Sequence, residues 1–207
     1  MAAAQALAIS QPTMYSEEEY LRLENDAFEK SEYFEGQIIA MAGATPNHNR
    51  VKENIVGELY PILKKNKSCK SCSSDQRIHI PSNSLYTYPD IIIVCRPQKY
   101  AEHDRNTIVN PSVIVEILSP STMDYDRGLR FRLCRDIESL QEYVTLGSLS
   151  VQAEVWRRNA DNQWILADDA FSLTESITIQ TIGATLQVAD LYDGTENVSS
   201  LLPPLKE

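Results

Sequence analysis

Two apolar, β-branched runs in the middle of the chain, each carrying one acid, constrain its fold most strongly. Residues 89–95 read PDIIIVC and residues 112–118 read SVIVEIL. Runs this apolar are typical of central strands that are covered on both faces. An acid in such a run is costly unless it is paired, hydrogen-bonded or bound to a metal. The fold must therefore bring partners to Asp90 and Glu116.

The spacing of the two runs predicts how these acids lie. The connecting stretch is polar and centred on residue 103, the midpoint of 90 and 116. If the runs pair as antiparallel strands about this centre, Asp90 faces Glu116. Each acid shares its face of the sheet with the residues two positions away, because side chains alternate along a strand. We therefore expect the two carboxylates to converge on one divalent cation.

Two basic side chains begin the inward faces of predicted helices. Asn47 can cap a helix whose apolar residues recur at helical spacing, namely Val51, Ile55, Leu59 and Ile62. His48 lies on the same stripe in the first turn. A second helix is expected over 124–137, and Arg130 precedes its apolar positions by three, four and seven residues. Spacing thus directs both basic groups toward Asp90 and Glu116.

The remaining pattern predicts an α+β fold with helices packed on a mixed central β-sheet. Residues 16–26 indicate a helix that Ser16 caps, with Glu19 at the capping-box position. A hairpin turning at Glu35-Gly36 follows. Further strands are expected at 76–80, 142–146, 151–158 and 163–168, the first running back against the helix after residue 47. The segment SITIQTIGATLQVADLY is expected to add an edge to the sheet.

Composition indicates one soluble domain over 1–207, with loose tails at 1–13 and 193–207. The chain is 43% apolar with only 7 glycines, which argues against a fibre, a repeat array or a disordered chain. No apolar run approaches the length of a membrane span, and the first residues lack the basic start of a secretory signal. We expect a cytoplasmic protein without a membrane partner. Four cysteines are too few for a disulfide framework.

The net charge of −10 argues at first sight against a nucleic-acid partner, because polyphosphates are bound mainly by Lys and Arg. The charge is segregated, however. Residues 47–77 hold 7 basic groups against 3 acidic ones, and residues 126–137 hold 4 against 2. Either a local positive strip or solvated helix faces explains these counts.

An ordered set of motifs resembles a known family. Pro89-Asp90 followed by Glu116-Ile117-Leu118 resembles the PD-(D/E)xK nuclease superfamily. The wider set resembles the Uma-type endonuclease family over roughly residues 14–192, and its motifs are EYFEGQIIAMAG, His48, YPDIIIVC, VIVEILSPST, YDRGLRFRLCRDI and SLQEYVTL.

This resemblance implies a restriction-endonuclease-like fold and divalent-metal-dependent hydrolysis of DNA phosphodiester bonds. Asp90, Glu116 and the backbone carbonyl of Ile117 would hold Mg²⁺, or Mn²⁺ in its place, since Mg²⁺ prefers oxygen ligands. The ion would acidify an attacking water and stabilise charge on phosphorus. A homodimer is expected, because cutting both DNA strands favours two-fold symmetry.

The chain departs from the superfamily at Leu118, where the ExK motif has lysine. In the resembling family the basic group comes from the following helix, at Arg130 here. Guanidinium holds phosphate but cannot accept a proton from water. We therefore assign phosphate to Arg130, and the base to His48 or a metal-bound water. Two alternatives stay open: a non-cleaving nucleic-acid-binding or accessory protein that retains the nuclease fold, and a hydrolase of a small phosphoester.

Two further polar residues are weaker candidates for the same cleft. Glu35 is expected mainly as the turn residue of its hairpin. Gln76 could face the site from the neighbouring strand, but nothing else in its sequence context points there.

Overall fold

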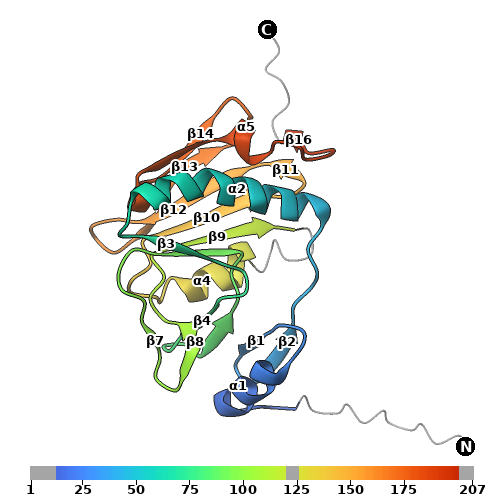
Figure 1. Ribbon diagram of the computed structural model, residues 1–207, viewed down its shortest axis with the longest axis vertical. Helices are drawn as coiled ribbons and strands as arrows, with labels where there is room; N and C mark the ends of the chain where they lie inside the picture. The colour runs from blue at the N-terminus through green and yellow to red at the C-terminus, as the bar shows by residue number, and fades with distance from the viewer. Residues whose placement is uncertain (1–12, 120–125, 201–207) are drawn as a thin grey trace, which may run out of the picture.

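The computed structural model describes residues 13–119 and 126–200, which form two six-stranded sheets with helices packed on them (Figure 1). The first helix, α1 (Glu17–Asp26), begins as expected, because Ser16 caps it and Glu19 completes the capping box. The hairpin of β1 (Ser31–Phe34) and β2 (Gln37–Ala40) is also confirmed. Glu35 and Gly36 turn it at φ 47° and 82°.

The central sheet contains both acid-bearing runs and is mixed, as the sequence predicts. Its strand order is β13-β12-β10-β9-β6-β3. Strands β9 and β10 pair in parallel, and their other neighbours in the sheet pair antiparallel. The strands are β3 (Lys70–Ser73), β6 (Ile91–Val94), β9 (Val113–Leu118), β10 (Glu142–Gly147), β12 (Ala153–Arg158) and β13 (Trp164–Ala170).

The predicted register of the two apolar runs is confirmed. Ile91 lies opposite Val115, and Ile92 lies opposite Ile114. One step beyond, the same register sets residue 90 opposite residue 116. The polar stretch between the runs is more than a loop, because it forms β7 (Tyr100–Ala101) and β8 (Asp104–Ile108) of the other sheet.

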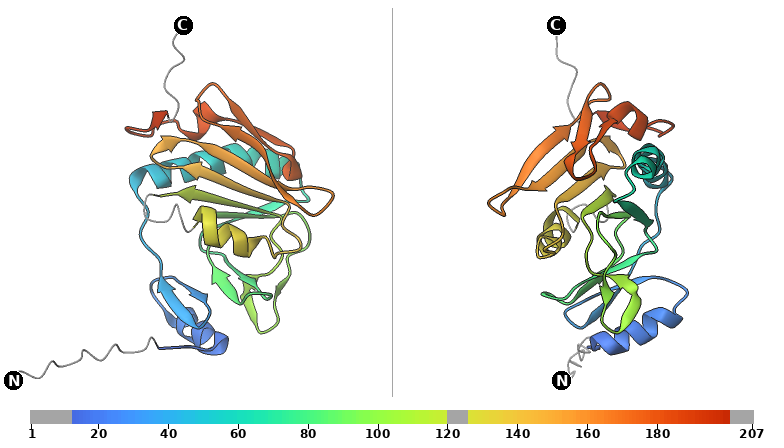
Figure 2. Two further views of the ribbon diagram at one scale, coloured as in Figure 1. Left: turned by 180° about the vertical axis from the view of Figure 1, so that it is seen from behind. Right: turned by 60° about the vertical axis from the view of Figure 1, so that its left-hand side comes forward.

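Helices cover the two faces of the central sheet (Figure 2). On one face lies α2 (Pro46–Lys65), whose buried stripe packs against Ile91, Ile93 and Val115. The other face buries Ile92 and Ile114 beneath a π-helical turn, η1 (Asp126–Arg130), and the short helix α4 (Phe131–Cys134). The expected second helix is thus shorter than 124–137, and residues 124–125 lie outside the described residues.

The cap of α2 differs from the expected one. Thr45, rather than Asn47, is the N-cap, and its hydroxyl accepts from the His48 N–H at 3.2 Å. Pro46 takes the first helical position, where its missing N–H costs nothing. The Asn47 side chain instead donates to the Glu196 carbonyl at 2.7 Å.

The second sheet was not expected from the sequence. Its order is β2-β1-β5-β4-β8-β7, in which β4 (Arg77–Ile80) pairs with β5 (Leu85–Thr87) and β8. The prediction that 76–80 runs back against α2 is therefore wrong. Strand β3 takes the place beside β6, and a disulfide joins Cys69 to Cys95 at the end of this pair.

The C-terminal part forms small units rather than the predicted edge strand. Strands β14 (Ser176–Ile179) and β15 (Ala184–Gln187) make their own two-stranded sheet, with η2 (Gln180–Ile182) at its turn. Helix α5 (Val188–Leu191) then packs against α2. Part of the predicted loose C-terminal tail is a strand, because β16 (Ser199–Ser200) pairs with β11 (Ser150–Val151). Most of the predicted N-terminal tail lies outside the described residues.

Among residues 13–119 and 126–200, every helix is too short or too polar to cross a bilayer.

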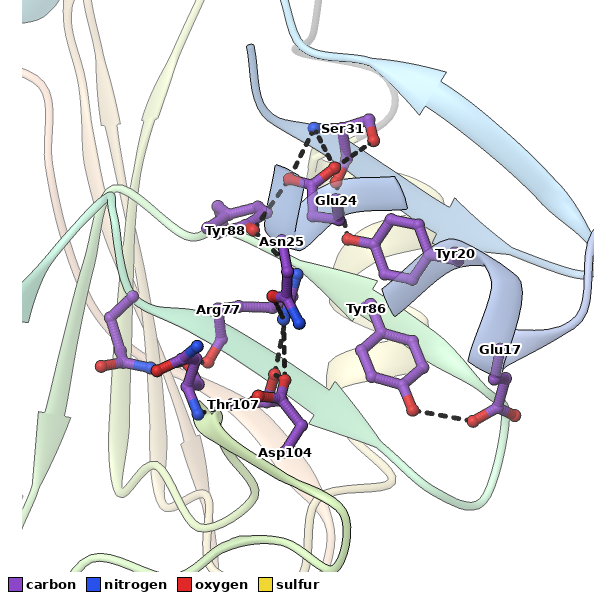
Figure 3. Close-up of polar contacts among 12 residues, drawn as sticks. Glu17, Tyr20, Glu24, Asn25, Ser31, Arg77, Tyr86, Tyr88, Asp104 and Thr107 are labelled. Atoms are coloured by element: carbon purple, nitrogen blue, oxygen red, sulfur yellow. Dashed lines mark hydrogen bonds and ion pairs between the residues drawn. The ribbon is translucent and has the colours of Figure 1, made fainter. Parts of the chain in front are cut away.

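A buried arginine ties α1 to the second sheet (Figure 3). Arg77 is 2% exposed, and its guanidinium donates to Asp104 at 2.7 Å and to Thr107 at 2.8 Å. It also donates to the Asn25 side chain of α1 at 3.0 Å and to the Tyr88 hydroxyl at 3.2 Å. Each of these groups gives up hydrogen bonds to water when it is buried. Without the arginine, one of the protein hydrogen bonds that replace them would be missing.

We expect Arg77→Met to lower the free energy of unfolding by about 3–5 kcal/mol, because it leaves the carboxylate of Asp104 buried without its cation. Urea denaturation followed by circular dichroism measures this. The matched control is Arg22→Met in α1, where the side chain is exposed and the change should stay within about 0.5 kcal/mol. Equal losses in both variants would contradict this role for Arg77.

Asp104 makes part of this stability pH-dependent. Burial acts to raise its pKa, but hydrogen bonds from Thr107, the Asn106 N–H and Arg77 outweigh burial and lower it. A carboxyl whose pKa is lower in the folded state stabilises the fold above its unfolded pKa and loses that contribution as the pH falls through the folded value.

The difference in unfolding free energy between the unmodified chain and Asp104→Asn should therefore be constant above pH ~5 and shrink below pH ~4, the ordinary pKa of aspartate. Urea denaturation at a series of pH values tests this. A difference that does not change with pH would show that the carboxylate contributes nothing through its charge.

Candidate functional site

Asp90 and Glu116 lie against each other at one end of the β6–β9 pair. The Asp90 N–H donates to Glu116 Oε2 at 3.2 Å, and the Ile117 N–H donates to Asp90 Oδ2 at 2.9 Å. The Glu116 side chain is 3% exposed, whereas that of Asp90 is 15% exposed. The antiparallel register therefore holds the two acids next to each other, and Asp90 is the more exposed of the two.

His48 approaches the same acid from the first turn of α2. Its Nε2 lies 3.1 Å from Asp90 Oδ2, and its side chain is 12% exposed. Its buried Nδ1 has no hydrogen-bond partner among the described residues. When Nε2 carries the proton and donates it to the carboxylate, Nδ1 becomes a proton acceptor. The hydrogen bond from the His48 N–H to the Thr45 hydroxyl fixes the start of the helical turn that carries this ring.

Arg130 approaches Glu116 from the opposite face of the sheet, at the end of the π-helical turn η1. Nη1 donates to Glu116 Oε1 at 3.0 Å, and Nη2 donates to Glu32 Oε1 at 2.5 Å. Turns of this kind are frequent at functional sites. Leu118, the position where the superfamily has lysine, is buried at 1% exposure. Arg130 is thus the basic side chain that contacts Glu116, and Leu118 offers no charge there.

Glu32 is a site residue that sequence reasoning missed. It lies in β1 of the second sheet, is 4% exposed, and also accepts a hydrogen bond from the Thr87 hydroxyl. The signal was available, because Glu32 stands in a short strand beside the buried Tyr33. The argument that a buried acid needs a partner, applied above to Glu116, extends to it.

The structure thus brings His48, Asp90, Glu116 and Arg130 together as the spacing predicts. Two weaker candidates do not join them. Glu35 is exposed in the β1–β2 turn. Gln76 donates its amide to the Arg77 and Asn106 carbonyls.

The donor set suits a hard cation such as Mg²⁺. The Arg130 guanidinium contacts the carboxylates of Glu116 and Glu32, and Asp90 contacts Glu116 through its backbone N–H, so three acids stand against one arginine and a cation would offset the excess negative charge. Both hydrogen bonds to the Asp90 carboxylate fall on Oδ2, and within the described residues none falls on Oδ1. Carboxylate and carbonyl oxygens with several retained waters are the usual surroundings of Mg²⁺.

Within the described ranges, no group of three or more His, Cys, Asp and Glu side chains is arranged as a metal cage. A set of two carboxylates and the Ile117 carbonyl is smaller than such a cage, so water and substrate oxygens would have to complete the coordination of an ion.

Comparison with known proteins assigns the chain to a family. A family model described as "Uma2: Putative restriction endonuclease" matches residues 17–189. Two uncharacterised proteins of Synechocystis sp. are each 35% identical to this chain. One match extends over 150 residues, 72% of this chain and 84% of the relative, and the other over 182 residues, 86% and 92%.

The fold is also found in a solved structure, described as that of a putative nuclease belonging to DUF820 from Anabaena variabilis. That chain superposes with a TM-score of 0.67 at 18% sequence identity, covering 84% of this chain and 96% of the other. At this identity the likeness concerns the fold, and it supports the restriction-endonuclease-like architecture expected from the sequence.

The Arg130–Glu32 ion pair should be measurable by a double-mutant cycle of Arg130→Met and Glu32→Gln. Because the two side chains are 9% and 5% exposed, we expect a coupling energy of about 1–3 kcal/mol in urea denaturation. Glu53→Gln, an exposed site on α2, should be additive with Arg130→Met to within about 0.5 kcal/mol. Additivity in both cycles would mean that the ion pair does not hold the two sheets together.

Proposed function

Because the chain belongs to the Uma2 family, we propose that it is a divalent-metal-dependent endonuclease that hydrolyses DNA phosphodiester bonds. The observation that carries this proposal is the contact between Asp90 and Glu116 across the β6–β9 pair, with Arg130 bound to the second acid. A pair of carboxylates beside a guanidinium provides the charges that phosphoryl transfer needs.

In this proposal Asp90, Glu116 and the carbonyl of Ile117 hold Mg²⁺, or Mn²⁺ in its place. Once bound, the ion acidifies the attacking water and stabilises the charge that builds up on the phosphate. The protein contributes the rigid placement of the oxygens. Asp90 is fixed by His48 and by the Ile117 N–H, so its carboxylate needs no reorganisation when a cation arrives.

Arg130 and His48 have separate roles. The planar fork of Arg130 binds phosphate oxygens and offsets charge, but it cannot take up a proton. His48 holds Asp90 through Nε2, and its Nδ1, the acceptor in that tautomer, is buried. We assign the orientation of phosphate to Arg130 and the role of general base to His48 or to a metal-bound water.

A non-cleaving nucleic-acid-binding or accessory protein is the second candidate, and one observation favours it. The guanidinium of Arg130 is engaged by Glu116 and Glu32, and Leu118 provides no second cation beside them. If Arg130 stayed in this position with substrate bound, the site would bind nucleic acid without stabilising the transition state.

We further propose DNA as the partner and a homodimer as the working form. One Asp90–Glu116 pair per chain provides for one strand break, so two chains related by a two-fold axis would cut both strands. The acidic body of the protein restricts phosphate contacts to local basic elements.

Asp90→Asn and Glu116→Gln should each lower Mg²⁺-dependent cleavage of supercoiled plasmid at least about a hundredfold, because each removes a charged ligand of the ion. Gel conversion of supercoiled to nicked and linear forms measures this. The matched controls are Asp161→Asn and Glu53→Gln, which make the same chemical changes at exposed positions and should cleave at the unmodified rate.

Cleavage that survives both site variants would refute this metal site. If the unmodified chain binds DNA with a steep salt dependence but leaves the plasmid intact in Mg²⁺ and Mn²⁺, the non-cleaving function is correct instead.

A further inference from the structure

Three basic side chains line a pocket at the end of the central sheet where α2 leads into β3 (Figure 1). The pocket has a volume of about 470 Å³, and the rest of its lining around Lys67, Lys70 and Arg96 is uncharged. All three residues are exposed. In the described part of the chain none of them forms an ion pair, whereas Arg77 and Arg157 each hold a carboxylate. Like charges around one pocket repel each other, so an anion there would lower the free energy of the arrangement.

The sequence around this basic cluster contains no acid. Residues 59–74 and 91–101, which include all of the lining residues, carry six basic side chains and no carboxylate. The Cys69–Cys95 disulfide joins the two segments, and each of these cysteines immediately precedes a basic residue of the cluster. The backbone that carries the cations is therefore held together covalently. In a chain with a net charge of −10, this segregation creates a local positive potential.

A polar edge of the central sheet leads from the cluster toward the acids of the site. Strand β3 is the last strand of this sheet, and no strand among the described residues pairs with its outer side. It runs from Lys70 in the cluster to Ser73, which lies opposite Ile91, the neighbour of Asp90. Ser71 and Ser73 are exposed along this edge, and their hydroxyls can donate to phosphate oxygens.

A further cation lies where this edge meets the site. Lys52 of α2 donates to the Ser74 hydroxyl at 2.7 Å. It is four positions after His48 and therefore on the same side of the helix. The first acid that follows β3 along the chain, Asp75, is paired with Lys30. The edge thus offers hydroxyls between cations, which suits a negatively charged chain lying along it.

The distance between the cluster and the site fits a nucleic-acid backbone. From Asp90 to Cys95 the chain advances five residues, or about 17 Å at the spacing of a strand. Duplex DNA advances about 3.4 Å along its axis for each phosphate of one strand, so roughly five phosphates separate the two positions. A duplex is rigid over this length and would reach both at once.

We propose that Lys67, Lys70 and Arg96 bind the phosphate backbone of duplex DNA about five base pairs from the phosphate held at the Asp90–Glu116 site. The inference rests on the proposed function, because it names the surface that holds the same substrate away from the bond that is cut. Contacts of this kind read no bases. They fix the position and direction of the duplex on the protein.

The test measures binding without metal, so that it does not depend on cleavage. The full chain in EDTA is titrated into a dye-labelled duplex of ~20 base pairs at several KCl concentrations, with fluorescence anisotropy as the readout. The double variant Lys67→Gln with Lys70→Gln should bind at least about tenfold more weakly at ~0.1 M salt. The slope of log K against log salt concentration should become shallower by about 2, since each lost phosphate contact removes about 0.9.

The matched control is Arg22→Gln with Arg105→Gln, which removes the same charge from exposed positions of α1 and β8. It should keep the affinity to within about twofold, because distant exposed charges are screened at this salt concentration. Arg96→Gln, on the other side of the pocket, should make the slope shallower by about 1.

Equal losses in the two double variants, an unchanged salt slope in the lysine variant, or no binding of the duplex would overturn the proposal. Tighter binding of a single strand of the same length would overturn the choice of duplex. Failure of plasmid cleavage is a separate outcome. If the unmodified chain binds the duplex through the cluster but does not cut DNA, the binding surface stands and the proposed hydrolysis falls. If the lysine variant binds and cuts as the unmodified chain does, the hydrolysis stands and the surface falls.

Discussion

The guanidinium of Arg130 links the two sheets at the point where function is expected. One of its nitrogens donates to Glu116 in the central sheet and another to Glu32 in the second sheet. The three side chains are nearly removed from water, so each charge depends on the others for compensation. Once this pairing is required, the N-terminal hairpin, strand β9 and the turn before α4 must meet in one place.

The rest of the architecture fits this requirement. Helix α2 covers the face of the central sheet opposite to η1 and α4, which leaves its first turn free to bring His48 to Asp90 at the sheet's end. The acids are therefore approached from both sides of the sheet. Contacts from β1, α2, β9 and η1 hold these side chains before any ligand arrives, and such preorganisation is what charge stabilisation in catalysis needs.

Much of this arrangement was predictable because it follows from local sequence patterns, or from the equal distances of Asp90 and Glu116 from the centre of the stretch between them. The cap of α1 and the Glu35-Gly36 turn follow from short-range chemistry, and the facing of Asp90 and Glu116 follows from the centre of the connecting stretch. The second sheet was not predictable in this way. It pairs β4, where a strand was expected, in parallel with β8, which lies in polar sequence that carries no strand signal of its own. Glu32 lies in a predicted hairpin, where its burial could have been suspected, but its partner Arg130 lies in an element whose position relative to that hairpin the local pattern does not reveal.

The long separation between Glu32 and Arg130 has a consequence for how the molecule is made. These residues are 98 positions apart, and the hairpin that carries Glu32 is synthesised before the turn that carries Arg130. The acid therefore cannot meet its cation until the intervening strands have been synthesised. A nascent chain that ends before Arg130 would hold an uncompensated carboxylate at Glu32. Formation of the site is in this way a late, long-range step of folding.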